Sequence, residues 1–142
     1  MQNTIALPVP SSSRGAHVGL WVTQGLLAAA FLMSGAMKLT APIEQLRAQM
    51  PWVSGGMGGA VRFIGLVEVL GAVGVVLPAA TRVMPKLTPL AAAGLGTVMA
   101  LASLTHGSRG EFGMIPVNLV LGGMAAFVAW GRTRKAPIEA RG

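Results

Sequence analysis

The chain has 142 residues, of which 53% are hydrophobic and only 11% are charged, and its formal net charge is +7. Soluble domains have about 25% charged residues, so this composition argues against a soluble globular fold. The absence of cysteine excludes disulfides, cysteine metal sites, Fe–S clusters and covalently attached c-type haem in this chain.

Lys and Arg are spread over the connections and the C-terminal tail, where anionic lipid headgroups attract them. We therefore expect contact with a lipid bilayer and no binding of nucleic acid.

Four apolar segments follow one another, and most approach the roughly 20 residues needed to cross about 30 Å of hydrocarbon. A soluble bundle would carry polar residues on its outer faces, yet the third segment has no charge between Lys86 and Arg109. The second segment reaches full length only with Val61, Arg62 and Pro78. These segments predict an all-α integral membrane four-helix bundle over residues 18–131. The four segments are residues 18–37, 63–77, 87–105 and 112–130.

The first apolar segment follows a stretch rich in proline and serine. Residues 1–17 contain Pro8, Pro10 and three serines, a composition that cannot bury a core, so we expect a disordered cytoplasmic tail. A cleaved signal peptide is the alternative for the first segment, but signals have only about 7 to 15 apolar residues. We expect a retained span, in which Gln24 forms a hydrogen bond to another helix.

The connection between the first two spans has a helical pattern of its own. Pro42 and Glu44 suit the start of a helix, and Trp52 suits a position among the lipid headgroups. A glycine-rich run at residues 55–59 then gives a flexible return into the second span. This pattern predicts a short amphipathic interfacial helix between spans 1 and 2. The apolar residues at helical spacing are Ile43, Leu46, Met50 and Val53.

Prolines and small residues mark the later spans. Pro78, Pro85 and Pro89 are expected to end helices and to keep the second connection short. Small residues recur on one face of each span, where they allow close approach of helices in lipid, and these faces are expected to point inward. The faces are Gly65, Glu68, Ala72 and Val75; Ala92, Gly96, Ala100, Ser103 and His106; and Asn118, Gly122, Ala125 and Ala129.

The distribution of Lys and Arg predicts the orientation in the membrane. Four spans put both termini on one side, and that side has seven Lys and Arg residues against four on the other. Both termini are therefore expected in the cytoplasm, with residues 132–142 as a basic tail. The first and third connections then lie outside.

Glu68 is the one acid inside a span. A charge at the bilayer centre costs about 2.5 to 3.5 kcal/mol on insertion scales, so Glu68 needs a partner, a proton or a function. Arg62 is nearest in sequence, but the two residues fall on different faces of the helix. We expect a partner from another helix.

Several polar residues are expected at the depth of Glu68. Lys38, Arg62, His106, Glu111 and Asn118 all fall in the outer third of the bundle. One hypothesis, which we favour, is an outward-facing polar pocket that binds a ligand, with Glu68 as the proton or cation site. The other is a buried Lys38–Glu68 ion pair that fixes helix register, with Asn118 bonding across helices.

The sequence offers little for a resident cofactor. His17 and His106 fall at opposite ends of their spans, about 30 Å apart, so they do not ligate one haem. Zinc-ligand spacing, a phosphate loop, a nucleophile elbow and a dinucleotide fingerprint are all absent from the sequence.

Four elements of the sequence together resemble the DoxX-like family of small bacterial membrane proteins. They are FLMSGAMKLTAP at residues 31–42, RFIGLVEVLGAVGVVLP at residues 62–78, the third span with His106 and Glu111, and residues 118–132 ending in AWGR. The resemblance implies a four-helix bundle in the bacterial cytoplasmic membrane. It also matches Lys38, Glu68, His106, Glu111 and Asn118 to polar positions of the family. Some relatives are linked to thiosulfate:quinone oxidoreductase and to complexes that protect against oxidative stress.

Three functions remain open. The first is a non-catalytic subunit or scaffold that binds a partner protein, and a quinone or lipid in the outer pocket. The second is a quinone-positioning subunit of a membrane oxidoreductase, with Glu68 or His106 as proton acceptor. The third is a small proton-coupled transporter, acting as a homo-oligomer.

Overall fold

The computed structural model describes residues 14–142, whose regular structure consists of helices without strands. Four helices are long and apolar enough to cross a membrane, the last of them spanning Phe112–Lys135. The prediction of an all-α membrane four-helix bundle is therefore confirmed. The helices are α1 (Arg14–Thr40), α2 (Ile43–Gln49), α3 (Gly58–Thr81), α4 (Leu87–Ser108) and α5 (Ile115–Trp130), with a 3-10 turn at Phe112–Met114 and a π turn at Gly131–Lys135.

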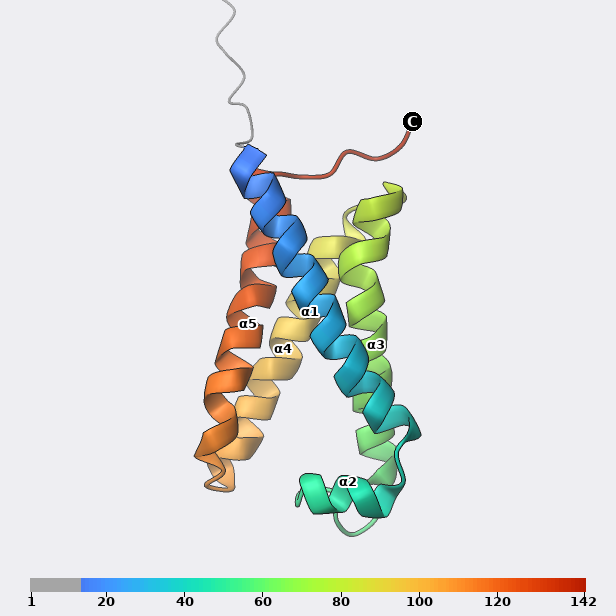
Figure 1. Cartoon of the computed structure of the whole chain (residues 1–142), viewed down its shortest axis with the longest axis vertical. Helices are drawn as coiled ribbons and strands as arrows, with labels where there is room; N and C mark the ends of the chain where they lie inside the picture. The colour runs from blue at the N-terminus through green and yellow to red at the C-terminus, as the bar shows by residue number, and fades with distance from the viewer. Residues whose placement is uncertain (1–13) are drawn as a thin grey trace, which may run out of the picture.

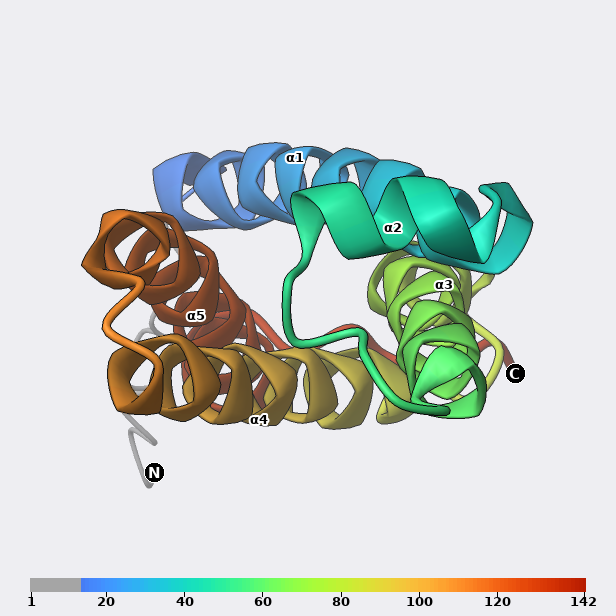
Figure 2. The same cartoon turned by 90° about the horizontal axis from the view of Figure 1, so that it is seen from below.

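The long helices pack mainly as the pairs α1 with α3, α3 with α4 and α4 with α5. The helix α1 crosses the bundle diagonally, from beside the end of α5 to beside the start of α3 (Figure 1). The start of α1 and the C-terminal residues lie at the same end of the bundle, which we call the inner end. The opposite end, called the outer end, carries α2 (Figure 2).

A buried apolar core runs through the middle of the four long helices, while large side chains such as Leu26, Leu70 and Leu104 are exposed on the outside. Such exposure suits helices surrounded by hydrocarbon. The inward face predicted for α3 is confirmed in full, whereas Ala100 on α4 was expected inside and is exposed. The core residues are Leu27, Phe31, Ala72, Val75, Ala92, Leu95, Met99, Ala125 and Val128.

Two proline expectations were wrong. Pro78 lies inside α3, which continues to Thr81, and Pro89 lies in the first turn of α4. Pro89 removes only an N–H that has no partner in a first helical turn. Pro78 removes one bond near a helix end, and apolar surroundings favour continued helix because unpaired backbone groups are costly there.

Both chain ends differ from the predicted tails. Residues 1–13 lie outside the described residues, but residues 14–17, expected in the disordered tail, form the first turn of α1. At the other end, the chain after α5 does not leave the bundle as a free basic tail. Arg132 is 3% exposed, and Arg141 N–H donates to the carbonyl of Arg82 beyond α3 (2.9 Å).

The interfacial helix is confirmed as α2. Its residue Leu46 packs with Val53 and Val61 in a small core of their own, and Trp52 lies half-buried against it. The apolar side of α2 is thus used within the protein, which holds this helix to the ends of α1 and α3. A position of Trp52 among lipid headgroups stays a prediction.

Candidate functional site at the outer end

Two glycines allow α1 and α3 to approach closely just beneath the outer end. A Cβ built on Gly65 would lie 2.8 Å from Cβ of Lys38 and 2.9 Å from the carbonyl oxygen of Gly35. Side chains on a helix lean toward its N-terminus, so on these antiparallel helices Lys38 leans inward and Glu68 outward. The two side chains therefore lean toward each other.

Lys38 and Glu68 form a buried ion pair. The ammonium nitrogen Nζ lies 2.9 Å from Oε1 and 2.8 Å from Oε2 of Glu68, and it also donates to Ser34 Oγ. The side chains are only 11% and 3% exposed. All three ammonium protons have acceptors and both carboxylate oxygens accept, so the pair is satisfied within the protein. The partner from another helix, expected for Glu68, is Lys38.

Arg62 supports the same region without touching Glu68. Its guanidinium donates to the carbonyl oxygens of Lys38 (2.5 Å) and Ala41 (2.7 Å), which closes the C-terminal end of α1. The expectation that Arg62 and Glu68 lie on different faces of α3 agrees with these contacts. Arg62 thus acts as a cap for α1.

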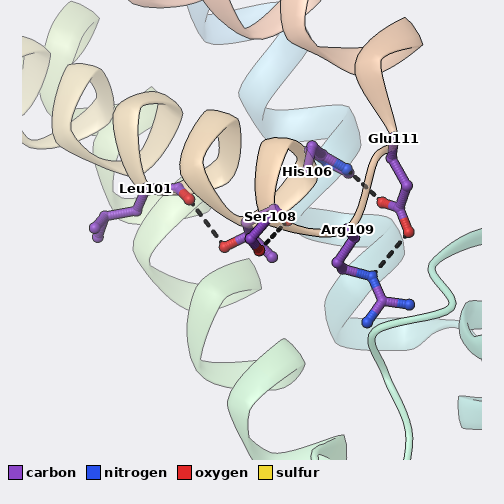
Figure 3. A network of polar contacts seen from close by, with 6 residues as sticks. Leu101, His106, Ser108, Arg109 and Glu111 are labelled. Carbon is purple, nitrogen blue, oxygen red and sulfur yellow. Dashed lines mark hydrogen bonds and ion pairs between the residues drawn. The ribbon is translucent and has the colours of Figure 1, made fainter.

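A second polar cluster lies at the α4–α5 connection (Figure 3). Glu111 accepts from His106 Nδ1 at 2.7 Å and from Arg109 Nε at 2.8 Å. These hydrogen bonds, the one from Arg109 most, lower the pKa of the Glu111 carboxyl below its ordinary value. A carboxylate can only accept, so His106 Nδ1 is the donor of this hydrogen bond and Nε2 is left for another partner.

Within residues 14–142, Asn118 has a buried amide nitrogen without a partner, as Thr88 has a buried hydroxyl without one. Asn118 is 6% exposed, and its amide nitrogen Nδ2 is buried with no hydrogen bond in the described part of the chain. The cross-helix bond expected for Asn118 is therefore not formed by Nδ2. The residue lines a groove between α4 and α5.

The residues predicted for one pocket are thus divided. Lys38, Arg62 and Glu68 come together between α1 and α3, while His106 and Glu111 pair at the α4–α5 connection. Among residues 14–142 no hydrogen bond or ion pair joins the two groups, and ligand binding by either stays a prediction. Within that range, no group of three His, Cys, Asp or Glu residues is placed to hold a metal ion.

Sequence reasoning missed a polar cluster at the inner end. Arg132 donates from Nε to Gln24 Oε1 (2.6 Å) and lies over the Trp21 ring, and its Nη1 approaches His17 (3.2 Å). Gln24 also donates to the carbonyl of Val75 on α3, so its predicted interhelical bond is confirmed. The signal available was Gln24 itself, since an amide at that depth needs a partner and Arg132 directly follows the last span.

The family comparison agrees with this architecture. The sequence model described as the DoxX-like family matches residues 22–128, about three quarters of the chain. No curated protein and no solved structure matches the chain. The match extends from the first span to near the end of the last, and the chain belongs to the DoxX-like family.

Proposed function

We propose that this DoxX-like protein is a non-catalytic membrane subunit, or scaffold, that holds a partner protein at the outer end of its bundle. The observation that carries the proposal is the closed Lys38–Glu68 pair. The one acid inside a span uses both oxygens on the lysine, and the lysine has no donor left. Such a pair fixes how α1 and α3 cross, and so positions α2.

The helix α2 supplies a surface for the partner. Its apolar residue Leu46 is fully buried, whereas Glu44, Gln45 and Gln49 are exposed. Arg47 Nε donates to the carbonyl of Val53 (3.2 Å), which holds the loop that follows. A polar helix face fixed at the outer end suits a protein partner there, and the outer end is also where we place a lipid or quinone ligand.

A change confined to α2 tests this proposal. Gln45→Glu with Gln49→Glu adds two charges to exposed positions and leaves the buried side of α2 intact. The tagged chain is purified from membranes in mild detergent, and co-purifying proteins are quantified by mass spectrometry. A partner lost with this variant but kept with Ala140→Glu, an exposed position at the inner end, supports the proposal. A partner retained by both variants contradicts docking on α2.

A second function is favoured by the pair of His106 and Glu111. With Nδ1 donating to an ionised carboxylate, His106 Nε2 is suited to accept a proton at the membrane boundary. We propose as the alternative a subunit that positions a quinone headgroup near His106, while a partner protein supplies the redox centre. A quinol-dependent signal in the purified complex, lost in His106→Gln, supports it. A complex without such a signal supports the scaffold.

A proton-coupled transporter is the third proposal, and it requires Glu68 to exchange protons with water. Proton-linked uptake into liposomes tests it. The Lys38 contacts of Glu68 favour the scaffold over this role.

A further inference from the structure

The groove between α4 and α5, which we call the α4/α5 groove, is open to the surroundings and has a volume of about 1030 Å³. Small residues line it on both sides, so the helix backbones lie close to its floor. None of its lining residues is charged, and Asn118 lies toward its outer end. The lining includes Ala93, Gly96 and Ala100 of α4 and Gly122, Gly123 and Ala126 of α5.

Asn118 indicates which hydrogen-bonding group the occupant of the groove must have. The residue is 6% exposed with Nδ2 buried and unpaired, and an unpaired amide in apolar surroundings costs free energy until it meets an acceptor. The residue lies six positions after Phe112, about 9 Å into the span at 1.5 Å per residue. Lipid acyl chains at that depth have no hydrogen-bonding group, so they fill the groove without satisfying Asn118.

We propose that the α4/α5 groove is a self-association surface, and that its occupant is the same face of a second copy of this chain. Two copies inserted in the same orientation are related by a twofold axis along the membrane normal. Such an axis brings each residue opposite residues of the same depth. Asn118 of one copy then lies opposite Asn118 of the other, and a turn of the amide about χ2 brings its donor to the groove. An amide is its own complement because it has both a donor and an acceptor.

The small residues and the absence of charge serve the same contact. Helices associate in lipid through close backbone packing and interhelical hydrogen bonds, for which Gly, Ala and Asn are suited. Two uncharged faces also meet without like-charge repulsion. This inference does not depend on the proposed function, since a scaffold or a quinone-positioning subunit works equally as one copy or two.

Two matched glycine variants test the surface. A Cβ on Gly123, in the groove, and a Cβ on Gly25, on the exposed side of α1, would each meet nothing within 4 Å. Both positions are exposed, so Gly123→Leu and Gly25→Leu are each expected to keep the fold of the single copy, which helical content and thermal unfolding check. The full chain has no cysteine, so Gly142→Cys gives one labelling site for fluorescence energy transfer between copies in phosphatidylcholine liposomes.

The expected results follow from the contact. Energy transfer rises as the lipid-to-protein ratio falls, Gly123→Leu weakens association by about tenfold or more, and Gly25→Leu leaves it unchanged. Asn118→Leu weakens association by roughly 3- to 20-fold, the range for one polar contact between membrane helices. A further expectation is disulfide formation with added oxidant between copies of Ala126→Cys and not of Leu26→Cys.

Three results would overturn the proposal. The first is a monomer at every lipid-to-protein ratio. The second is an equal effect of Gly123→Leu and Gly25→Leu. The third is a monomer that carries a lipid or quinone in native mass spectrometry and loses it in Asn118→Leu, which assigns the groove to a small amphiphile.

Discussion

Gly35 and Gly65 lie against each other where α1 crosses α3, and a Cβ on Gly35 would stand 2.7 Å from the carbonyl oxygen of Gly65. On each helix the charged residue follows three positions later, as Lys38 and as Glu68. The contact between the glycines therefore sets the helix separation at which the ion pair forms. Helix packing and electrostatics at this crossing depend on each other.

Gly65→Ala is expected to separate α1 from α3. The added methyl group would contact Lys38 and the backbone of Gly35, and overpacking of this kind costs about 1 to 3 kcal/mol. Thermal unfolding in detergent measures the loss. Gly25→Ala, at an open helical position, is the control and is expected to be neutral or slightly stabilising. Equal stability of the two variants would show that the crossing is not tightly packed.

Removing one member of the Lys38–Glu68 pair is expected to destabilise the bundle strongly. Glu68→Gln leaves the lysine charge buried, and breaking a buried pair from one side costs about 3 to 5 kcal/mol. Lys38→Met strands the carboxylate in the same way, whereas the double variant removes both charges and should recover much of the loss. Unfolding of all three variants measures the coupling. A stable Glu68→Gln variant that loses ligand or partner binding would instead support the polar pocket.

Features that depend on the local sequence could be predicted, whereas features that depend on helix packing could not. The four spans and α2 are confirmed because long apolar segments and helical spacing report directly on burial. The end of α3 was predicted too early because the proline rule considers only the local sequence. Apolar surroundings favour continued helix beyond Pro78. Arg132 was assigned to a tail because counting charges along the chain gives no depth, and only the fold brings Arg132 beside Gln24. The unpaired Nδ2 of Asn118 likewise requires the packing of α4 and α5.

The pKa of the Glu111 carboxyl is expected to lie below its ordinary value, with the hydrogen bond from Arg109 as the main cause. Because the pKa of Glu111 is lower in the folded protein than in the unfolded one, ionised Glu111 stabilises the fold at a pH above the pKa of the unfolded state. This stabilisation is lost as the pH falls through the pKa of the folded state. Arg109→Gln should raise the pKa of Glu111 more than His106→Gln does. Carboxyl carbon-13 NMR of the purified protein measures all three midpoints. A larger rise of this pKa with His106→Gln would show that His106, and not Arg109, is the main cause of the lowered pKa.

Both termini are expected in the cytoplasm, on the evidence of the Lys and Arg distribution. A fluorescent protein fused after Gly142 should be bright, and alkaline phosphatase at the same position should be inactive, because each reporter works on one side only. The opposite pattern would reverse the orientation. It would also place the Lys38–Glu68 pair and α2 on the cytoplasmic side.

The inner-end cluster is expected to depend on Gln24 as the acceptor for a buried guanidinium. Gln24→Leu removes the acceptor of Arg132 Nε, and an unsatisfied buried group of this kind costs about 1 to 3 kcal/mol, more when it is charged. Arg132→Met removes the donor to two neutral acceptors, Gln24 Oε1 and the carbonyl of Ala136, and strands no charge, so it should cost less. The double variant should be more stable than Gln24→Leu alone. Arg134→Met, at an exposed position two residues away, is the control and should change stability little. Thermal unfolding of the four variants in one detergent gives the comparison. If Gln24→Leu and Arg134→Met have the same small effect, water or lipid solvates Arg132 and the cluster contributes no net stability.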